Sequence, residues 1–318
     1  MKLKSKKVIV TGGAGVIGRE LIKKLVEKEA VVRCFDIAPK PRIFSKEVDY
    51  CQEDLSKLNQ IEFTNFNPEI IFHLAATFER TEEDINFWEF NFLNNILLSH
   101  KVIDAAKECK NLEKFLFASS YLVYSPSLYL FKKPIHKPVK LKENDRINPR
   151  NLCGAAKLYI EKELEYLNNF KKEYPFESVL ARIFRVYGRS SRDVISRWVR
   201  MGLRGELIEV FLKENSFDYI FSEDVAEGLL RLAENNKARG IVNLGSGESR
   251  KIEEVVKIIK KQIPSLKIKE ITKKNLFEAS CADISRLKKL TGWEPTITLE
   301  QGIKMIINYE IKQKGENW

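Results

Sequence analysis

Cys153 and Lys157 are the residues of this sequence whose spacing first suggests chemistry. The stretch NLCGAAKLYIE, residues 151–161, predicts the start of a helix and places these two side chains one turn apart on one face. A thiol near an ammonium and a helix N-terminus can ionise to a thiolate, which is a base and a nucleophile. The same pattern also fits a small buried side chain beside an unrelated lysine. The pair therefore indicates acid–base chemistry, and its meaning depends on the elements that position it.

A glycine-rich turn predicts a nucleotide site near the N-terminus. The sequence TGGAGVIG, residues 11–18, follows a short apolar strand and opens an amphipathic helix. Gly12 permits the tight turn, Gly15 lets a pyrophosphate approach the backbone, and Gly18 lets the helix pack closely on the strand. The N-terminus of that helix would then face the phosphates of the nucleotide.

An acidic residue extends this pattern to a choice of cofactor. Asp36 ends the second expected strand, where its carboxylate can accept hydrogen bonds from a ribose 2′-hydroxyl and would repel a 2′-phosphate. The next residue, Ile37, cannot clamp a phosphate, although Lys40 and Arg42 follow shortly after it. The sequence therefore predicts NAD rather than NADP.

Strands and helices alternate along the first part of the chain. Apolar strands are expected at 6–11, 30–37, 67–76, 114–120 and 176–184, with helices at 19–30, 87–110 and 154–170 between them. This alternation is typical of an α/β protein with a Rossmann doubly wound parallel sheet and a smaller C-terminal substrate domain. We expect an NAD-binding domain at 1–181, to which the chain returns around 218–245, and a smaller mixed substrate-binding part at 182–318.

Composition excludes several other classes of protein. The net charge of +11 comes from lysines spread along all 318 residues, which favours a solvated basic surface over a nucleic-acid site. No apolar run reaches the roughly 18 residues of a membrane span. Cysteines and histidines are scattered without ligand spacing, so neither a disulfide framework nor a metal site is expected. A cytoplasmic protein is the simplest interpretation.

Ordered motifs from one end of the chain to the other point to a family. They are TGGAGVIG at 11–18, Asp54-Leu55, HLAA at 73–76, Asn95, SSYLVY at 119–124, RIFRVYG at 182–188, the segment 217–225, NLGSG at 243–247 and the segment 282–293. This series resembles the extended short-chain dehydrogenase/reductase family, which includes NAD-dependent sugar-nucleotide epimerases and dehydratases. The resemblance implies that the cofactor is lined by Gly12, Gly15, Val16, Ile17, Gly18, Asp36, Asp54, Leu55, Leu74, Ala75, Ala76, Asn95, Lys157 and Phe184.

The chain departs from that family at its catalytic pair. The family motif is YxxxK, whose tyrosinate removes the hydroxyl proton while hydride leaves for NAD, and here Cys153 replaces the tyrosine while Lys157 remains. Ser120 aligns with the hydroxyl that orients the substrate. Three interpretations stay open. Cys153 is the base; Tyr121 or a water takes over; or catalysis is lost and the chain is a regulatory or partner subunit.

Three arginines follow the RIF segment and suggest a charged substrate. Arg185 stands where the family usually has an asparagine, and Arg189 and Arg192 are close to it, so an anionic group such as a diphosphate, phosphate or carboxylate is expected beside them. Lys273 falls near a substrate arginine of the family. The resemblance implies an NAD-dependent oxidoreductase or epimerase that acts on a sugar nucleotide or other anionic sugar derivative and forms a homodimer.

Overall fold

The computed structural model describes residues 2–58, 60–78, 83–271 and 276–315, and its centre is a parallel sheet of seven strands. The strand order is β12-β8-β5-β4-β1-β2-β3, and every neighbouring pair is parallel. These strands are β1 (Lys7–Thr11), β2 (Val31–Asp36), β3 (Asp49–Gln52), β4 (Ile70–His73), β5 (Lys114–Ser120), β8 (Glu177–Ile183) and β12 (Gly240–Leu244). The order reverses between β1 and β4, and open sheets of this kind bind ligands at such a point, beyond the carboxyl ends of the strands.

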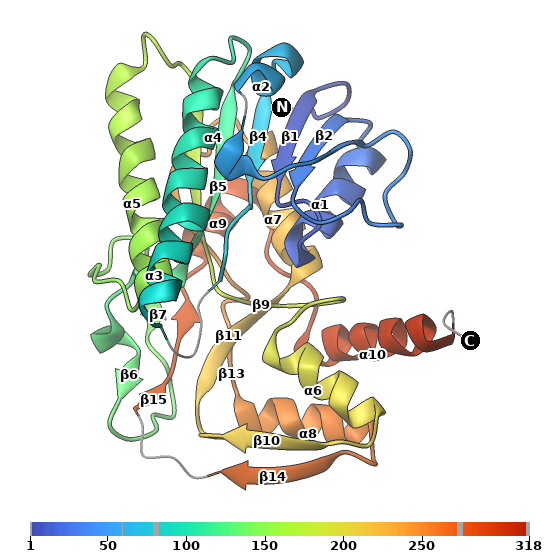
Figure 1. Cartoon of the computed structure of the whole chain (residues 1–318). Coiled ribbons are helices and arrows are strands. Elements are labelled where there is room, and N and C mark those ends of the chain that lie inside the picture. Colours follow the sequence, from blue (N-terminus) through green and yellow to red (C-terminus); the bar gives the residue numbers. More distant parts are fainter. Residues whose placement is uncertain (1, 59, 79–82, 272–275, 316–318) are drawn as a thin grey trace.

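Alternation along each strand divides the core between the two faces of the sheet. Val8 and Val10 of β1 pack with one buried cluster, whereas Ile9 between them belongs to the other. The first cluster includes residues of α1 (Val16–Glu27), α7 (Ser222–Glu234) and α9 (Ser285–Thr291), and the second includes residues of α2 (Gln60–Phe66), α4 (Leu98–Lys107) and α5 (Leu152–Leu167). Figure 1 shows α4 and α5 side by side on one face and α1 and α7 on the other.

One long helix changes its winding in the middle. α3 (Ile85–Asn91) continues into η2 (Phe92–Leu97), which is a turn of π-helix, and then into α4. The sequence predicts a single helix over 87–110, so it finds the helix but not the bulge. A π-turn inside an α-helix is rare and is frequently found at functional sites.

A smaller C-terminal part has a third apolar cluster. It contains a three-stranded sheet of β9 (Arg185–Tyr187), β11 (Ser216–Phe221) and β13 (Ser249–Lys251), and a parallel pair of β10 (Leu207–Phe211) and β14 (Lys267–Ile271). Its helices are α6 (Val194–Leu203), α8 (Ile252–Gln262) and α10 (Leu299–Gly315), which lie below and to the right of the large sheet in Figure 1. The predicted α/β class, with a Rossmann sheet and a C-terminal part, is confirmed.

Two short strand pairs join distant segments beside the carboxyl ends of the large sheet. β6 (Leu130–Phe131) pairs with β15 (Phe277–Glu278), and β7 (Lys140–Leu141) pairs with β16 (Cys281–Ala282). Short helical turns η1 (Leu55–Lys57), η3 (Tyr121–Val123), η4 (Pro126–Leu128) and η5 (Asn168–Phe170) complete the described elements. These pairs hold the segment after β5 against the segment before α9.

Candidate active site

The glycine turn between β1 and α1 has no room for a side chain at two of the three positions that the sequence singled out, Gly12 and Gly18. Gly12 has φ +72°, and a Cβ there would lie 2.6 Å from the backbone nitrogen of Ala75. A Cβ on Gly18 would lie 2.5 Å from the carbonyl oxygen of Gly12. Among the described residues, no side chain caps α1 at Gly15, and its first turn carries no acid. The turn therefore leaves the first N–H groups of α1 available to an anion, which fits a dinucleotide pyrophosphate.

Asp36 braces this turn from the end of β2. One carboxylate oxygen accepts the N–H of Ala14 at 2.8 Å, and the other accepts the N–H of Ala38 at 2.9 Å. Each oxygen keeps a second lone pair, so the carboxylate can still accept a ribose hydroxyl. Asp54 caps η1 through the N–H of Ser56, and the bonds from Ser56 hold the pKa of Asp54 below its usual value. Leu55 beside it is buried.

A fully buried histidine links β1 and β4 to the helix above them. Ser99 Oγ donates to the carbonyl of Asn95 at 2.6 Å, so its oxygen must accept from His73 Nε2 at 2.9 Å. His73 Nδ1 is then the acceptor for Thr11 Oγ1 at 2.7 Å, and Thr11 Oγ1 accepts the N–H of Ala75 at 3.3 Å. Burial, with a contribution from Lys157, lowers the pKa of His73 to about 3, so this ring is neutral.

The first turn of α5 contains the pair of residues noted first in the sequence. Asn151 caps the helix by accepting the N–H of Gly154 at 2.9 Å. Cys153 is buried, and its sulfur lies 3.9 Å from Asn95 Nδ2 of the π-turn. Lys157 is also buried, with its ammonium 4.7 Å from the centre of the Phe117 ring. Burial lowers the pKa of Lys157 to about 8, which Cys153 and Glu161 partly oppose.

The two adjacent serines at the end of β5 differ in their surroundings. Ser119 is buried and donates to Glu161 at 2.5 Å, and this carboxylate also binds the buried Arg182 guanidinium through two nitrogens. Ser120 is half-buried and accepts the N–H of Leu122 at 3.2 Å. Its hydroxyl proton has no acceptor within the described part of the chain, so it can be directed to a substrate oxygen. Ser119 therefore has a structural role through Glu161, whereas the hydroxyl of Ser120 can still donate a hydrogen bond to a substrate, as the sequence predicts.

Tyr121 lies in a polar cluster away from solvent. Its hydroxyl donates to Glu278 at 2.9 Å, its ring stacks on Phe184 with 5.2 Å between centres, and its side chain is buried. The other oxygen of Glu278 binds the guanidinium groups of Arg150 and Arg185, the latter at 3.5 Å. The hydroxyl proton of Tyr121 is therefore directed to a carboxylate of the protein itself.

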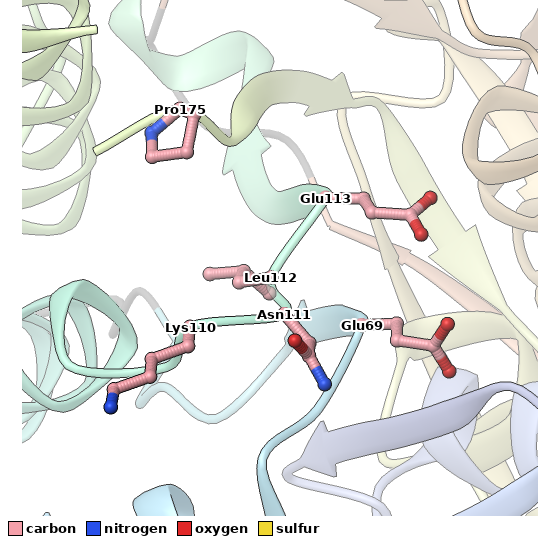
Figure 2. A pocket seen from close by; sticks show the side chains of 6 residues that line it. All are labelled: Glu69, Lys110, Asn111, Leu112, Glu113 and Pro175. Atoms are coloured by element: carbon pink, nitrogen blue, oxygen red, sulfur yellow. The ribbon is translucent and has the colours of Figure 1, made fainter. Parts of the chain in front are cut away.

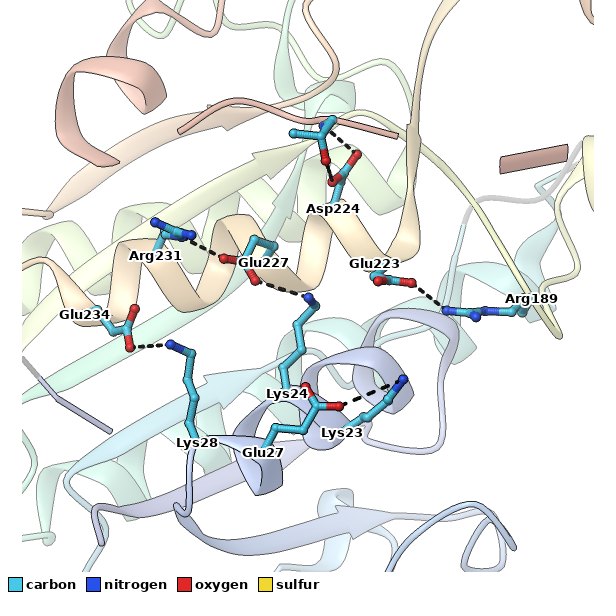
Figure 3. A network of polar contacts seen from close by, with 11 residues as sticks. Lys23, Lys24, Glu27, Lys28, Arg189, Glu223, Asp224, Glu227, Arg231 and Glu234 are labelled. Atoms are coloured by element: carbon cyan, nitrogen blue, oxygen red, sulfur yellow. Dashed lines mark hydrogen bonds and ion pairs between the residues drawn. The ribbon is translucent and has the colours of Figure 1, made fainter. Parts of the chain in front are cut away.

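The three predicted substrate arginines are placed differently from one another. Arg185 lies beside Tyr121, and its guanidinium stacks over Phe217 at 4.3 Å. Arg189 is bound by Glu20 of α1 at 2.8 Å and by Glu223 of α7 at 2.7 Å, and Figure 3 shows its side chain reaching Glu223. Arg192 is exposed. The structure therefore brings one of the three to the cluster near Ser120, and Lys273 lies outside the described residues.

A surface hollow lies at the amino ends of the strands, on the side of the sheet opposite to the glycine turn. Figure 2 shows its lining residues, which precede β4, β5 and β8 or follow α4: Glu69, Lys110, Asn111, Leu112, Glu113 and Pro175. Lys6 already binds Glu69 at 2.6 Å and Glu113 at 2.7 Å. The glycine turn follows the carboxyl end of β1, so this hollow is separate from the predicted cofactor site.

The fold and the glycine turn define a Rossmann-type dinucleotide-binding protein. The sequence model of the NAD dependent epimerase/dehydratase family matches residues 8–245, and the chain belongs to this family. This membership confirms the family predicted from the motifs and, with it, an enzyme that uses NAD. Within the described residues, no cluster of His, Cys, Asp and Glu is arranged to hold a metal ion.

Three known proteins show the extent of the similarity. The dTDP-4-dehydro-6-deoxyglucose reductase of Escherichia coli is 27% identical over 328 residues, covering 94% of this chain and 96% of the relative. The UDP-N-acetylglucosamine 4-epimerase of Methanobrevibacter ruminantium, solved with UDP-N-acetylmuramic acid, is 26% identical with a TM-score of 0.82 and coverage of 98% and 99%. An epimerase of Methanothermobacter thermautotrophicus has a TM-score of 0.86 at 22% identity, covering 99% of this chain and 94% of its own, which shows the fold.

Several site residues were missed by the sequence reasoning. Asn91 donates to the carbonyl of Leu152 at 3.2 Å, and Arg150 and Glu278 share the cluster around Tyr121. A signal existed for Glu161, because it lies four residues after Lys157 on the same helix face. Glu278 gave no such signal, since the other members of the cluster, Tyr121, Arg150 and Arg185, are far away in sequence.

Proposed function

We propose that this protein is an NAD-dependent oxidoreductase or epimerase that acts on a sugar nucleotide by hydride transfer at a carbinol carbon. The observation that carries this proposal is the physical link between the glycine turn and the first turn of α5. Through Thr11, His73, Ser99 and Asn95, hydrogen bonds run from the end of β1 to the sulfur of Cys153. The named relatives that act on dTDP- and UDP-sugars support a nucleotide sugar as substrate.

The residues present fit the cofactor. The glycine turn and the first turn of α1 would hold the pyrophosphate, Asp36 would accept ribose hydroxyls, and Asp54 and Leu55 would flank the adenine. The rest of the cofactor would be lined by Leu74, Ala75, Ala76, Asn95, Lys157 and Phe184. Bound NAD would supply a hydride acceptor for the substrate carbon. Lys157, with its ammonium buried beside Phe117, would hold the nicotinamide ribose.

For the proton, we propose Cys153 as the base, with Ser120 orienting the hydroxyl of the substrate. Cys153 lies in the first turn of α5, near Lys157, and receives an amide N–H from Asn95, all of which favour a thiolate. Tyr121 is a weaker candidate, because its hydroxyl is bonded to Glu278 inside the protein. A cysteine is shorter than a tyrosine, so a bridging water between the sulfur and the substrate hydroxyl is compatible with the same assignment.

We further propose that residues 182–318 supply most of the substrate site, while 1–181 and the returning segment around 218–245 hold the cofactor. In the large sheet, β12 pairs with β8, and α7 packs against α1, in agreement with this division. Arg185 would face an anionic group of the substrate, and exposed Arg192 would assist at the rim. For Arg189, the two carboxylates that bind it support a role in joining α1 to α7 instead.

A homodimer is proposed from the exposed aromatic residues of the helical face. Trp88 and Phe92 stack with ring centres 6.5 Å apart, and both are exposed, as are Phe90 on the same helix and Tyr159 and Tyr166 on α5. Exposed apolar patches of this kind are typical of interfaces. Light scattering coupled to gel filtration tests the assembly, and a monomer at micromolar concentration rejects it.

A cytoplasmic location is proposed from the free cysteines. All five lack a disulfide partner, and four of them are buried. Among the described residues, no helix has the length and apolar character needed to cross a bilayer.

The experiment that tests the function has two stages. Purified protein is first denatured, and the released nucleotide is identified with its redox state by mass spectrometry. The protein with added NAD is then incubated with UDP- and dTDP-linked sugars, and epimers and keto products are resolved by chromatography. Turnover that is lost in Cys153→Ala supports the proposal. Absence of bound nucleotide, together with no binding of added NAD, rejects it.

A further inference from the structure

The side chain of Asn95 is held in one orientation by its neighbours. The backbone N–H of Thr77, which can only donate, lies 2.8 Å from Asn95 Oδ1 and fixes that atom as the oxygen. Nδ2 therefore faces the other way, with two hydrogens to place. One is donated to Asn91 Oδ1 at 2.7 Å, and the other is directed to Cys153 Sγ at 3.9 Å.

Asn91 is fixed in the same manner from α5. Its Nδ2 lies 3.2 Å from the carbonyl oxygen of Leu152, which can only accept, so its Oδ1 must receive the hydrogen from Asn95. The backbone of Asn95 is held separately, because its carbonyl accepts the hydroxyl of Ser99. One buried unit is thus formed by the π-turn with Asn91, Asn95 and Ser99. Within it, the second amide hydrogen of Asn95 points to the sulfur of Cys153.

We propose that Asn95 is a positioning residue that directs an N–H group at the Cys153 sulfur and favours its thiolate over its thiol. This inference rests on the proposed role of Cys153 as the base. A hydrogen bond donated to the charged form of a group favours that form, and in a buried site it is not shared with water. The missing tyrosine of the family motif would then be replaced by a thiolate with its own dedicated donor.

The charges around Cys153 act in both directions. On α5, the N-terminus of the helix and the Lys157 ammonium favour the thiolate, while Glu161 is one turn further on and is paired with Arg182. From β4, His73 is neutral. Glu83 opposes the thiolate, because its carboxylate accepts the N–H of Leu152 at 3.1 Å, and Arg150 just before the helix is bound to Glu278. The donor from Asn95 therefore acts in the same direction as the helix N-terminus and Lys157, and against Glu83.

The test measures the ultraviolet absorbance of the thiolate during a pH titration from about 6 to 10. Burial raises the pKa values of Cys51 to about 11 and of Cys34, Cys109 and Cys281 to about 12, so of the five thiols Cys153 is the one expected to titrate in this range, while exposed tyrosines such as Tyr159 and Tyr166 add a background as the pH nears 10. Subtraction of the titration of Cys153→Ser removes the remaining background. Asn95→Leu is expected to move the midpoint upward by about one pH unit.

Asn94→Leu is the matched control. It lies in the same π-turn, and its amide donates to the carbonyl of Phe90 instead of the sulfur, so its midpoint should equal that of the unchanged protein. If Asn95→Leu fails to fold, Asn95→Asp keeps the acceptor for Thr77 but places a carboxylate beside the sulfur. Its midpoint should move upward by more than one pH unit.

The inference is overturned if the midpoints of Asn95→Leu and Asn95→Asp match that of the unchanged protein, or if no Cys153 thiolate forms below about pH 10. These outcomes are separate from those of the proposed function, because the titration needs neither substrate nor turnover. A shifted midpoint in a protein that turns over no nucleotide sugar would keep the role of Asn95 and reject the proposed reaction.

Discussion

Two helices, α1 and α5, begin at the carboxyl edge of the same sheet, and their first turns are treated in opposite ways. The first turn of α1 follows Gly15, and among the described residues no side chain accepts its N–H groups. The first turn of α5 is satisfied by Asn151, which accepts the N–H of Gly154, and by Glu83, which accepts that of Leu152. Each terminus carries the same partial positive charge from its aligned peptides.

The difference shows how one physical feature serves two tasks. An uncapped terminus that follows a glycine turn has orphan donors, so it can bind the phosphate of an external ligand. A capped terminus has fewer donors to offer a ligand, and its field acts on a residue of its own first turn, here Cys153. The buried line through His73 and Asn95 joins the two, so the position of one terminus constrains the other.

The largest expected effect comes from the α5 side. Lys157→Met keeps the packing against Phe117 but removes the ammonium proposed to hold the nicotinamide ribose and to favour the Cys153 thiolate. We expect turnover to fall by about 10³-fold or more, within the range assigned to a positioned acid–base group plus its cofactor contact. Lys162→Met is the control on the same helix, since its ammonium only pairs with Glu165 at the surface. Equal turnover in both variants would remove Lys157 from the mechanism.

The α1 side is tested by a pair of glycines with the same backbone. Gly12 and Gly205 both have φ +72°, but a Cβ on Gly12 would lie 2.6 Å from Ala75, whereas one on Gly205 meets nothing within 4 Å. Gly12→Ala should weaken NAD binding by about 100-fold or more, near 2.7 kcal/mol, because the glycine turn must shift away from the position in which it would hold the pyrophosphate. Gly205→Ala shares only the backbone strain and should bind NAD normally in calorimetry. Equal losses of NAD affinity in the two variants would mean that backbone strain, rather than the lack of space beside Ala75, explains the result.

The same contrast explains what could be predicted from the sequence. The glycine turn is local: strand, glycines, helix and Asp36 follow one another within thirty-odd residues, so their pattern is visible in one dimension. The long strands and helices were found for the same reason, since hydrophobic periodicity is a local signal. β3 was missed, because its exposed and half-buried residues, DYCQ, show no apolar run.

The surroundings of Cys153 could not be read in that way. Its donor Asn95 is 58 positions away, and the cluster around Tyr121 depends on Glu278, which is 157 positions away. A π-turn has no distinct composition, so nothing in FLNNIL indicates that Asn95 and Asn91 are aligned toward α5. The sequence listed Tyr121 and Cys153 as competing candidates, and only the three-dimensional contacts distinguish a bonded phenol from a sulfur that receives a donor.

The buried hydrogen bonds that join the N-termini of α1 and α5 are tested through the pH dependence of stability. His73 has a pKa of about 3 in the folded protein and about 6.5 when unfolded, so below pH 6.5 the unfolded chain takes up a proton that the folded one refuses. Stability from this residue therefore falls as the pH drops from about 6.5 toward 3, by up to about 1.4 kcal/mol per pH unit. In His73→Gln that contribution is absent. Denaturant unfolding at several acidic pH values should therefore show that His73→Gln loses less stability on acidification than the unchanged protein. Parallel plots of unfolding free energy against pH for the two proteins would contradict the assignment of a neutral His73.

The smallest effect concerns how α1 is held in place behind its uncapped end. Figure 3 shows Lys24 of α1 reaching Glu227 of α7, at 3.2 Å with both side chains largely buried, while Lys23 pairs with Glu27 at 4.0 Å in solvent. Lys24→Met should lower the free energy of unfolding by roughly 0.5–1 kcal/mol, because Glu227 keeps Arg231 as a partner at 2.7 Å and is not left unpaired. Lys23→Met should change it by less than about 0.3 kcal/mol. If thermal unfolding ranks the two equally, the ion pairs between α1 and α7 do not fix the cofactor helix, and apolar packing between these helices must do so.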